Sequence, residues 1–176
     1  MTIETWKFIN SFAPWLSAIG SISAVITALY FSYSNRKILL KISADIFEFS
    51  ENEKFEEYVC IQILNTGFKS TLLHSFGWQT GIFRKRIIMT GRNNIDHNKS
   101  SIFSCKLAEG EMAQIAIKIN QEEHKNYLQM FFNDFLRKSP KMNLYSLKVV
   151  AYPSIGPPFK SKIGKTLRDK YKQIIG

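Results

Sequence analysis

A group of basic residues in the middle of the chain is the feature best suited to chemistry, and that chemistry is the binding of an anion. If residues 82–89 form a strand, Arg84 and Arg86 lie on one face and Lys85 on the other, because successive side chains alternate. Two guanidinium groups on one face suit bidentate binding of a phosphate. The sequence therefore predicts a phosphate site built from Arg84, Arg86, Arg92, His97 and Lys99.

Two aromatic residues near this group, Trp78 and Phe83, are candidates for a ring on which a nucleotide base stacks. The alternative interpretation is structural, because charged side chains also protect the edge strands of a sheet from pairing with another chain. The sequence leaves both interpretations open.

A second basic group lies near the C-terminus. After Tyr58 the chain holds 19 Lys and Arg against 7 Asp and Glu, an excess that favours anionic partners. A helix over 166–175 would gather part of this charge on one side, which is typical of a surface that lies against anionic lipid headgroups. The predicted lipid surface consists of Lys162, Lys165, Arg168 and Lys172.

The sequence carries none of the common catalytic or metal-binding motifs. It has no GxSxG, HExxH, P-loop or GxGxxG pattern. Its three histidines, His74, His97 and His124, are far apart, and Cys60 and Cys105 form no CxxC pair. We expect a protein that is not an enzyme and that uses no cofactor or metal.

The elements that position these residues begin with an apolar N-terminal segment. Residues 11–33 carry no charge, and these 23 residues correspond to roughly 35 Å of helix, enough to cross a bilayer. A cleaved signal peptide is the alternative, but it would have a basic start and a small-residue cleavage site. We predict a transmembrane anchor over 5–37 and a second domain over 38–176.

The basic residues Arg36, Lys37 and Lys41 follow the apolar segment, so this domain should be cytoplasmic and the N-terminus outside.

Small residues recur within the apolar segment at Gly20, Ala24 and Ala28. Their spacing of four places them on one stripe of a helix, where small side chains let a second helix approach closely. The stripe predicts helix–helix contact in a homo-oligomer.

From residue 38 the pattern changes to strands. Leu40, Ile42, Ala44 and Ile46 alternate with polar residues, which is the period of a half-buried strand. Pairs of strands about short turns are expected over 71–79 and 82–89, and over 102–107 and 112–119. One inserted helix is expected over 121–138, capped by Asn120 and Glu123, and a last helix over 166–175. The inserted helix should bury an apolar stripe of Tyr127, Leu128, Phe131, Phe135 and Leu136. The remaining predicted strands are 55–64, 144–152 and 159–163, so the sequence predicts a mainly β fold, a sandwich with two helices.

The order of a membrane helix, a basic stop, a strand ending in Ile-Leu-Asn-Thr-Gly (63–67) and a late Phe-Lys-Ser-Lys strand (159–162) resembles the immunoglobulin-like domains of small bacterial membrane proteins. The layout is also similar to membrane effectors of anti-phage systems, including accessory proteins of cyclic-oligoadenylate CRISPR signalling. The resemblance implies an immunoglobulin-like sandwich at the bacterial inner membrane. It also implies a sensor or effector in antiviral defence whose ligand is a nucleotide second messenger or cyclic oligonucleotide. The alternative function is a non-enzymatic adaptor that recruits a protein partner to the membrane.

Overall fold

The structure is a computed structural model that describes residues 3–35, 37–51, 54–82, 85–89, 95–101, 104–120 and 126–176. The chain divides into two compact units, Met1–Lys37 and Ile38–Gly176. The first unit contains one helix and the second contains the strands and the remaining helices.

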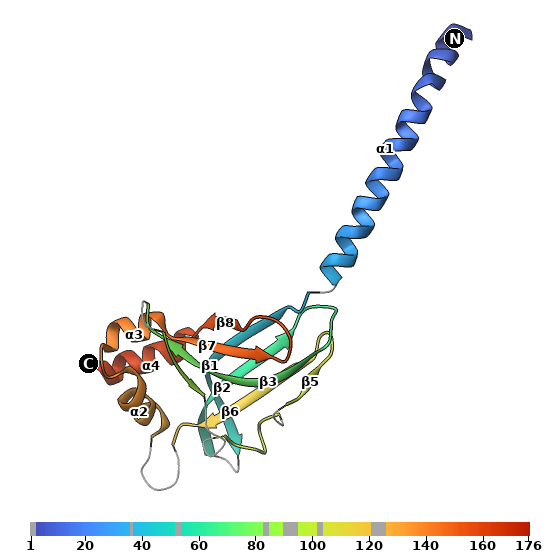
Figure 1. The fold of residues 1–176 in the computed structure, drawn as a ribbon. Helices are drawn as coiled ribbons and strands as arrows, with labels where there is room; N and C mark the ends of the chain where they lie inside the picture. The colour runs from blue at the N-terminus through green and yellow to red at the C-terminus, as the bar shows by residue number, and fades with distance from the viewer. Residues whose placement is uncertain are drawn as a thin grey trace. The chain divides into compact units, whose positions relative to one another are not determined.

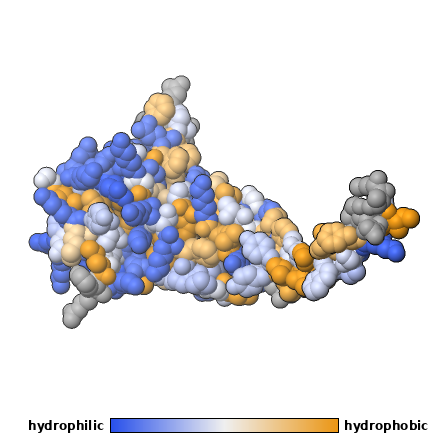
Figure 2. All heavy atoms as spheres, turned by 90° about the horizontal axis from the view of Figure 1, so that it is seen from above, coloured by the Kyte–Doolittle hydropathy of each residue, from blue (hydrophilic) through white to orange (hydrophobic). Residues whose placement is uncertain are grey.

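The first unit is helix α1 (Ile3–Asn35), whose ends lie two residues before those expected. Its segment Trp6–Asn35 is long and apolar enough to span a membrane, and no part of that segment is buried within the structure. Figure 2 shows hydrophobic residues along this helix and many hydrophilic residues over the visible face of the second unit. The hydroxyls of Ser11, Ser21 and Thr27 donate to carbonyls one turn earlier. These hydroxyls therefore need no outside partner, which suits a helix in lipid.

The second unit consists of two antiparallel sheets packed face to face, with helices gathered at one end (Figure 1). The first sheet has the order β1 (Leu40–Glu51), β2 (Lys54–Asn65), β6 (Met112–Lys118). The second has the order β4 (Arg86–Met89), β3 (Thr71–Thr80), β7 (Lys148–Pro153), β8 (Phe159–Lys162), and β5 (Lys106–Leu107) also pairs with β3. The helices are α2 (Tyr127–Phe131), η2 (Phe132–Leu136), α3 (Pro140–Ser146) and α4 (Lys165–Ile175). A mainly β, sandwich-like architecture is confirmed.

The alternation of apolar residues in the strands is confirmed by the core. On β1, Ile42 and Ala44 are buried, while Lys41 and Ser43 between them are exposed. Burial of apolar side chains contributes about 25 cal/mol per Å² and is the main term that holds the two sheets together. The core side chains of the other strands are Val59, Ile61, Ile63, Leu73, Phe76, Trp78, Leu107, Ala113, Ile115, Ile117, Val149 and Ala151.

The expected pairing of 71–79 with 82–89 is confirmed as β3 with β4, although β4 begins only at Arg86. The expected pairing of 102–107 with 112–119 is wrong. Segment β5 pairs with β3 in one sheet, whereas β6 pairs with β2 in the other. The buried Asn65 amide donates to the carbonyls of Lys69 and Leu107, which holds the chain at the point where it changes sheet. A period-2 pattern cannot show which partner a strand takes.

The helix expected over 121–138 is shorter and irregular, and residues 121–125, with Glu123, lie outside the described part. Its described N-cap is Asn126, whose side chain accepts from the N–H groups of Leu128 and Gln129, and not Asn120. After α2 the hydrogen bonding widens into the π-helical turn η2. The predicted apolar stripe is confirmed, because its residues are all buried: Tyr127, Leu128, Phe131, Phe135 and Leu136.

Helix α3 replaces the first part of the strand expected over 144–152. Pro140 occupies the start of the helix, where a missing N–H costs nothing because that group would have no helical partner. Asn143 and Leu144 of α3 are buried, and the Asn143 amide donates to the Leu136 carbonyl. The apolar residues that suggested a strand therefore pack as a helix, and β7 starts at Lys148.

Helix α4 confirms the expected last helix over 166–175 and is held by a contact from a distant strand. Its N-cap, Gly164, has no side chain to bind the first N–H groups. The Asp45 carboxylate on β1 accepts from the Leu167 N–H at 2.8 Å instead. A Cβ at Gly164 would collide with that carboxylate. The glycine therefore makes room for a cap supplied by β1.

Candidate functional site: a basic pocket on the outer sheet face

A pocket of about 400 Å³ lies on the outer face of the β4-β3-β7-β8 sheet, beside the end of α3. Its volume lies in the range of small-molecule sites in proteins. The sheet register builds its floor: Gln79 of β3 lies opposite Lys148 of β7, which in turn lies opposite Lys162 of β8. The full lining is Gln79, Gly81, Ile82, Lys85, Tyr145, Ser146, Lys148, Lys160 and Lys162.

The pocket concentrates positive charge. Lys85, Lys148, Lys160 and Lys162 all line it, and none of their side chains makes an ion pair or hydrogen bond with the described part of the chain. Lys148 and Lys162 are direct cross-strand neighbours. Like charges at such positions repel each other and destabilise the sheet. An anion in the pocket would remove this repulsion.

Lysines elsewhere on the domain do have acidic partners. Lys118 pairs with Glu56 at 2.6 Å, and Lys170 pairs with Glu57 at 2.7 Å. The hydrogen bond from Lys118, followed by that from Tyr58, holds the pKa of Glu56 below its usual value. The acidic β1–β2 hairpin therefore neutralises part of the basic excess, while the lysines of the pocket keep their charge.

The floor of the pocket contains a buried polar group with an unmet hydrogen bond. Gln79 is only 6% exposed, and its Oε1 has no partner among the described residues. Its neighbour Trp78 points into the core, so Gln79 faces the opposite side of the sheet, where the pocket lies. Buried polar groups are nearly always paired, so the Gln79 Oε1 calls for a partner such as a bound water, an ion or a ligand.

A hydrogen-bond network holds α3 beside this floor. The Thr80 hydroxyl lies 2.6 Å from the Asn143 carbonyl and 3.0 Å from the Ser146 hydroxyl. The Gly81 N–H donates to the same Ser146 hydroxyl at 2.9 Å. Gly81 has a φ of +97°, which a side chain would strain. The turn after β3 and the end of α3 therefore form one wall of the pocket.

The structure separates the residues of the predicted phosphate site. Arg84, Arg92 and the predicted stacking residue Phe83 lie outside the described residues. Arg86 faces the helices, where it donates to the Phe135 carbonyl at 3.0 Å and lies over the Phe135 ring. Lys85, which precedes β4, lines the basic pocket instead.

Lys99 and His97 belong to a different part of the surface. Lys99 donates to the Tyr58 hydroxyl at 3.0 Å and lies over the Tyr58 ring, on the outer face of the other sheet. His97 is exposed in the neighbouring turn. Trp78, the other predicted stacking residue, is 2% exposed and contacts Phe131, so its ring offers no open face. A pattern of charge and aromaticity could not show which rings are needed for the core.

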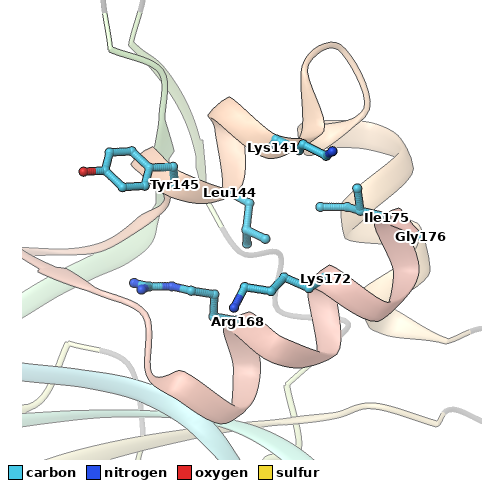
Figure 3. A pocket seen from close by; sticks show the side chains of 7 residues that line it. All are labelled: Lys141, Leu144, Tyr145, Arg168, Lys172, Ile175 and Gly176. Atoms are coloured by element: carbon cyan, nitrogen blue, oxygen red, sulfur yellow. The ribbon is translucent and has the colours of Figure 1, made fainter.

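The predicted lipid surface is also divided. Lys162 lines the basic pocket, and Lys165 is exposed at the start of α4. Arg168 and Lys172 line a second pocket, of about 390 Å³, between α3 and α4. Figure 3 shows that Arg168, Lys172 and Leu144 project into the space between the two helices. Lys172 is paired with Asp169 at 2.8 Å.

The described residues contain no group of three or more His, Cys, Asp or Glu side chains placed to hold a metal ion. Both cysteines are free thiols. Burial raises the pKa of Cys60 to about 11 and raises the pKa of Cys105 as well. A thiol with a raised pKa is a poor nucleophile at neutral pH.

Of the residues that line the basic pocket, only Lys162 was among the predicted site residues, and the strand residues Gln79, Lys148 and Lys160 were not. They lie far apart in the sequence and come together only through the strand register. A signal was present in Lys160 and Lys162, because two lysines at spacing two must share one strand face. No protein-family model, curated protein or solved structure matches the chain.

Proposed function

We propose that this protein is a membrane-anchored sensor whose folded domain binds an anionic, phosphate-bearing ligand in the basic pocket. The observation that carries the proposal is the set of four unpaired lysines around a pocket of ligand size. Ammonium groups bind phosphate oxygens through charge-assisted hydrogen bonds, and three of these lysines are held by sheet register.

In this proposal α1 is a single-pass anchor in a bacterial inner membrane and the folded domain is cytoplasmic. The charge-free segment and the basic residues after it support that orientation. The two facing sheets are compatible with the predicted immunoglobulin-like fold, which stays a prediction. A role in nucleotide-signalled antiviral defence, with an oligomer that passes binding on to the membrane helices, completes the proposal.

Within the folded domain, the pocket lies at the end of the sandwich opposite to the end where β1 begins. The Leu40 end of β1 is tied through Asn65 and Leu107 to the Thr71 end of β3. Gln79 is eight residues further along β3, or roughly 25 Å at the rise of a strand.

The test is calorimetric binding of inorganic triphosphate to the full-length protein in neutral detergent at low salt. Lys148→Glu and Lys162→Glu should each weaken binding at least about tenfold, since a hydrogen bond to a charged group contributes about 1.5–3 kcal/mol. The matched control is Lys106→Glu on β5, an exposed lysine at the opposite end of β3. A second control is Lys165→Glu, at the predicted lipid surface.

Both control variants should bind within about twofold of the wild type, and affinity should fall as salt rises, because exposed charges act over only about 8 Å at physiological ionic strength. Equal losses in all four variants would mean that net charge, and not the pocket, attracts the anion. If the wild type binds neither inorganic triphosphate nor any nucleoside triphosphate at low salt, the sensor proposal fails and the adaptor interpretation replaces it.

A further inference from the structure

The basic pocket presents two kinds of group that a single simple anion cannot satisfy. The ammonium groups of Lys85, Lys148, Lys160 and Lys162 are donors and need acceptor oxygens. The unpaired Oε1 of Gln79 is an acceptor and needs an N–H or O–H donor. An ionised phosphate offers only acceptor oxygens. It therefore accepts hydrogen bonds from the lysines but gives the Gln79 Oε1 no donor.

Neither the hydroxyls beside the pocket nor Lys148, which lies opposite Gln79 in the strand register, donates to the Gln79 Oε1 in this structure. The hydroxyl of Ser146, on the α3 wall of the pocket, lies within hydrogen-bond distance of the Met142 and Asn143 carbonyls and accepts from the Gly81 N–H. The Thr80 hydroxyl is likewise committed to the Asn143 carbonyl. Gln79 is more than nine-tenths buried, so bulk water does not reach it freely. A ligand group is therefore the natural partner.

The wall of the pocket also offers an open aromatic ring. Tyr145 lines the pocket and is 74% exposed, unlike Trp78, which belongs to the core. Figure 3 shows Tyr145 projecting from α3 on the side away from Lys141. A base can stack on an exposed ring whatever its sequence identity, because every base has a π-face.

We infer that the ligand of the basic pocket is a nucleotide, whose phosphates contact the lysines, whose base or ribose donates a hydrogen bond to Gln79, and whose base stacks on Tyr145. This inference rests on the proposed function and deepens it. It also replaces Trp78 with Tyr145 as the stacking residue and assigns Gln79 as the residue that distinguishes a nucleotide from an inorganic phosphate.

The test compares the four common nucleoside triphosphates with inorganic triphosphate, which carries similar charge and no donor-bearing organic part. Binding is measured on the full-length protein in detergent. At least one nucleotide should bind about tenfold more tightly than inorganic triphosphate. Gln79→Leu should remove this preference, since the substitution replaces an amide whose Oε1 is unpaired with an apolar side chain of similar size.

The matched control is Gln114→Leu on the other sheet, which should keep the full preference. Tyr145→Ala, at an exposed position, should reduce the preference several-fold and keeps the test decisive if Gln79→Leu fails to fold. Equal affinity of the wild type for nucleotides and inorganic triphosphate would overturn the inference. A preference for a nucleotide that survives both Gln79→Leu and Tyr145→Ala would overturn it too. Either result would leave the proposed function standing. If the wild type binds no anion at all, the proposed function fails together with the inference.

Discussion

At the scale of single residues, the functional surface depends on which charges are already paired. Arg86 has the fork geometry that suits phosphate, but its donors are used by carbonyls at the end of η2. Lys148 and Lys162 have simpler side chains and stay unpaired beside each other. A charge that stabilises its own fold is not free for a ligand, whereas a repelling pair is stabilised by one.

Asp45 gives a prediction at this scale. Its carboxylate accepts from Leu167 N–H and Ile46 N–H, at 2.8 Å and 2.9 Å, and caps α4 from another element. Asp45→Ala should lower the free energy of unfolding by about 1–2 kcal/mol, because loss of a cap leaves buried N–H groups without a partner. Denaturant titration of the full-length protein in detergent, followed by tyrosine and tryptophan fluorescence, measures this change.

The control is Glu48→Ala, which removes an exposed carboxylate from the same strand. It should change stability by less than about 0.5 kcal/mol. A loss of similar size in both variants would show that strand charge, and not the cap, is what Asp45 contributes.

At the scale of elements, the helices at one end of the sandwich do the positioning. Segments α2 and η2 close the core, and α3 carries Ser146 and Tyr145 to the pocket. The buried Asn143 ties α3 to the end of η2 through the Leu136 carbonyl. The pocket therefore exists only because the chain forms α3 where alternating apolar residues suggested a strand.

Helix α1 gives the prediction at the scale of elements. The space around Gly20 is open, with no atom within 4 Å of the position a Cβ would take. If a second copy packs on the stripe of Gly20, Ala24 and Ala28, Gly20→Leu should weaken self-association roughly tenfold, about 1.4 kcal/mol, by holding the helices apart. Crosslinking in detergent at several protein concentrations measures the change.

Ile22→Leu is the matched control, because it changes an apolar residue away from the stripe and keeps its volume. It should leave the crosslinked fraction unchanged. An oligomer that survives Gly20→Leu would have to be held by the folded domain, and the small-residue stripe would have no role in it.

At the scale of the whole molecule, the chain separates an apolar unit from a basic one. The first unit, Met1–Lys37, contains the helix that is long enough to span a membrane, and the unit from Ile38 has its own core between two sheets. Within the basic unit, the charges of some lysines are neutralised by neighbouring acids. Glu56 and Glu57 of β2 form ion pairs with Lys118 and Lys170. The unpaired charge of the basic pocket is therefore local.

This separation predicts how the protein behaves in cells. The full-length chain should sediment with membranes and need detergent for release, because an uncharged helix of this length partitions into lipid. The chain from Ile38 onward should be soluble. Immunoblots of membrane and soluble fractions measure both, with a soluble cytoplasmic enzyme as the fractionation control.

Recovery of the full-length chain in the soluble fraction would contradict the anchor. A mature form that begins after Tyr33 would mean that the apolar segment is a signal peptide. Either result would also remove the basis for a cytoplasmic domain.

The sequence by itself determined the apolar helix, the mainly β architecture, the inward faces of the strands and the local charge excess. Each of these follows from spacing along the chain, because the periods of helices and strands are local properties. Ile42 and Ala44 could be assigned to the core in this way, and so could the stripe from Tyr127 to Leu136.

Only the tertiary structure decided which strands pair, where α3 forms and which charges stay free. Gln79, Lys148 and Lys162 lie in three different strands, and the register of two strand pairs makes them neighbours. That register depends on how the whole core packs, because an apolar alternation is compatible with several partners. The same packing uses Trp78 in the core and Arg86 at the helices, and leaves the four lysines, Gln79 and Tyr145 at the pocket.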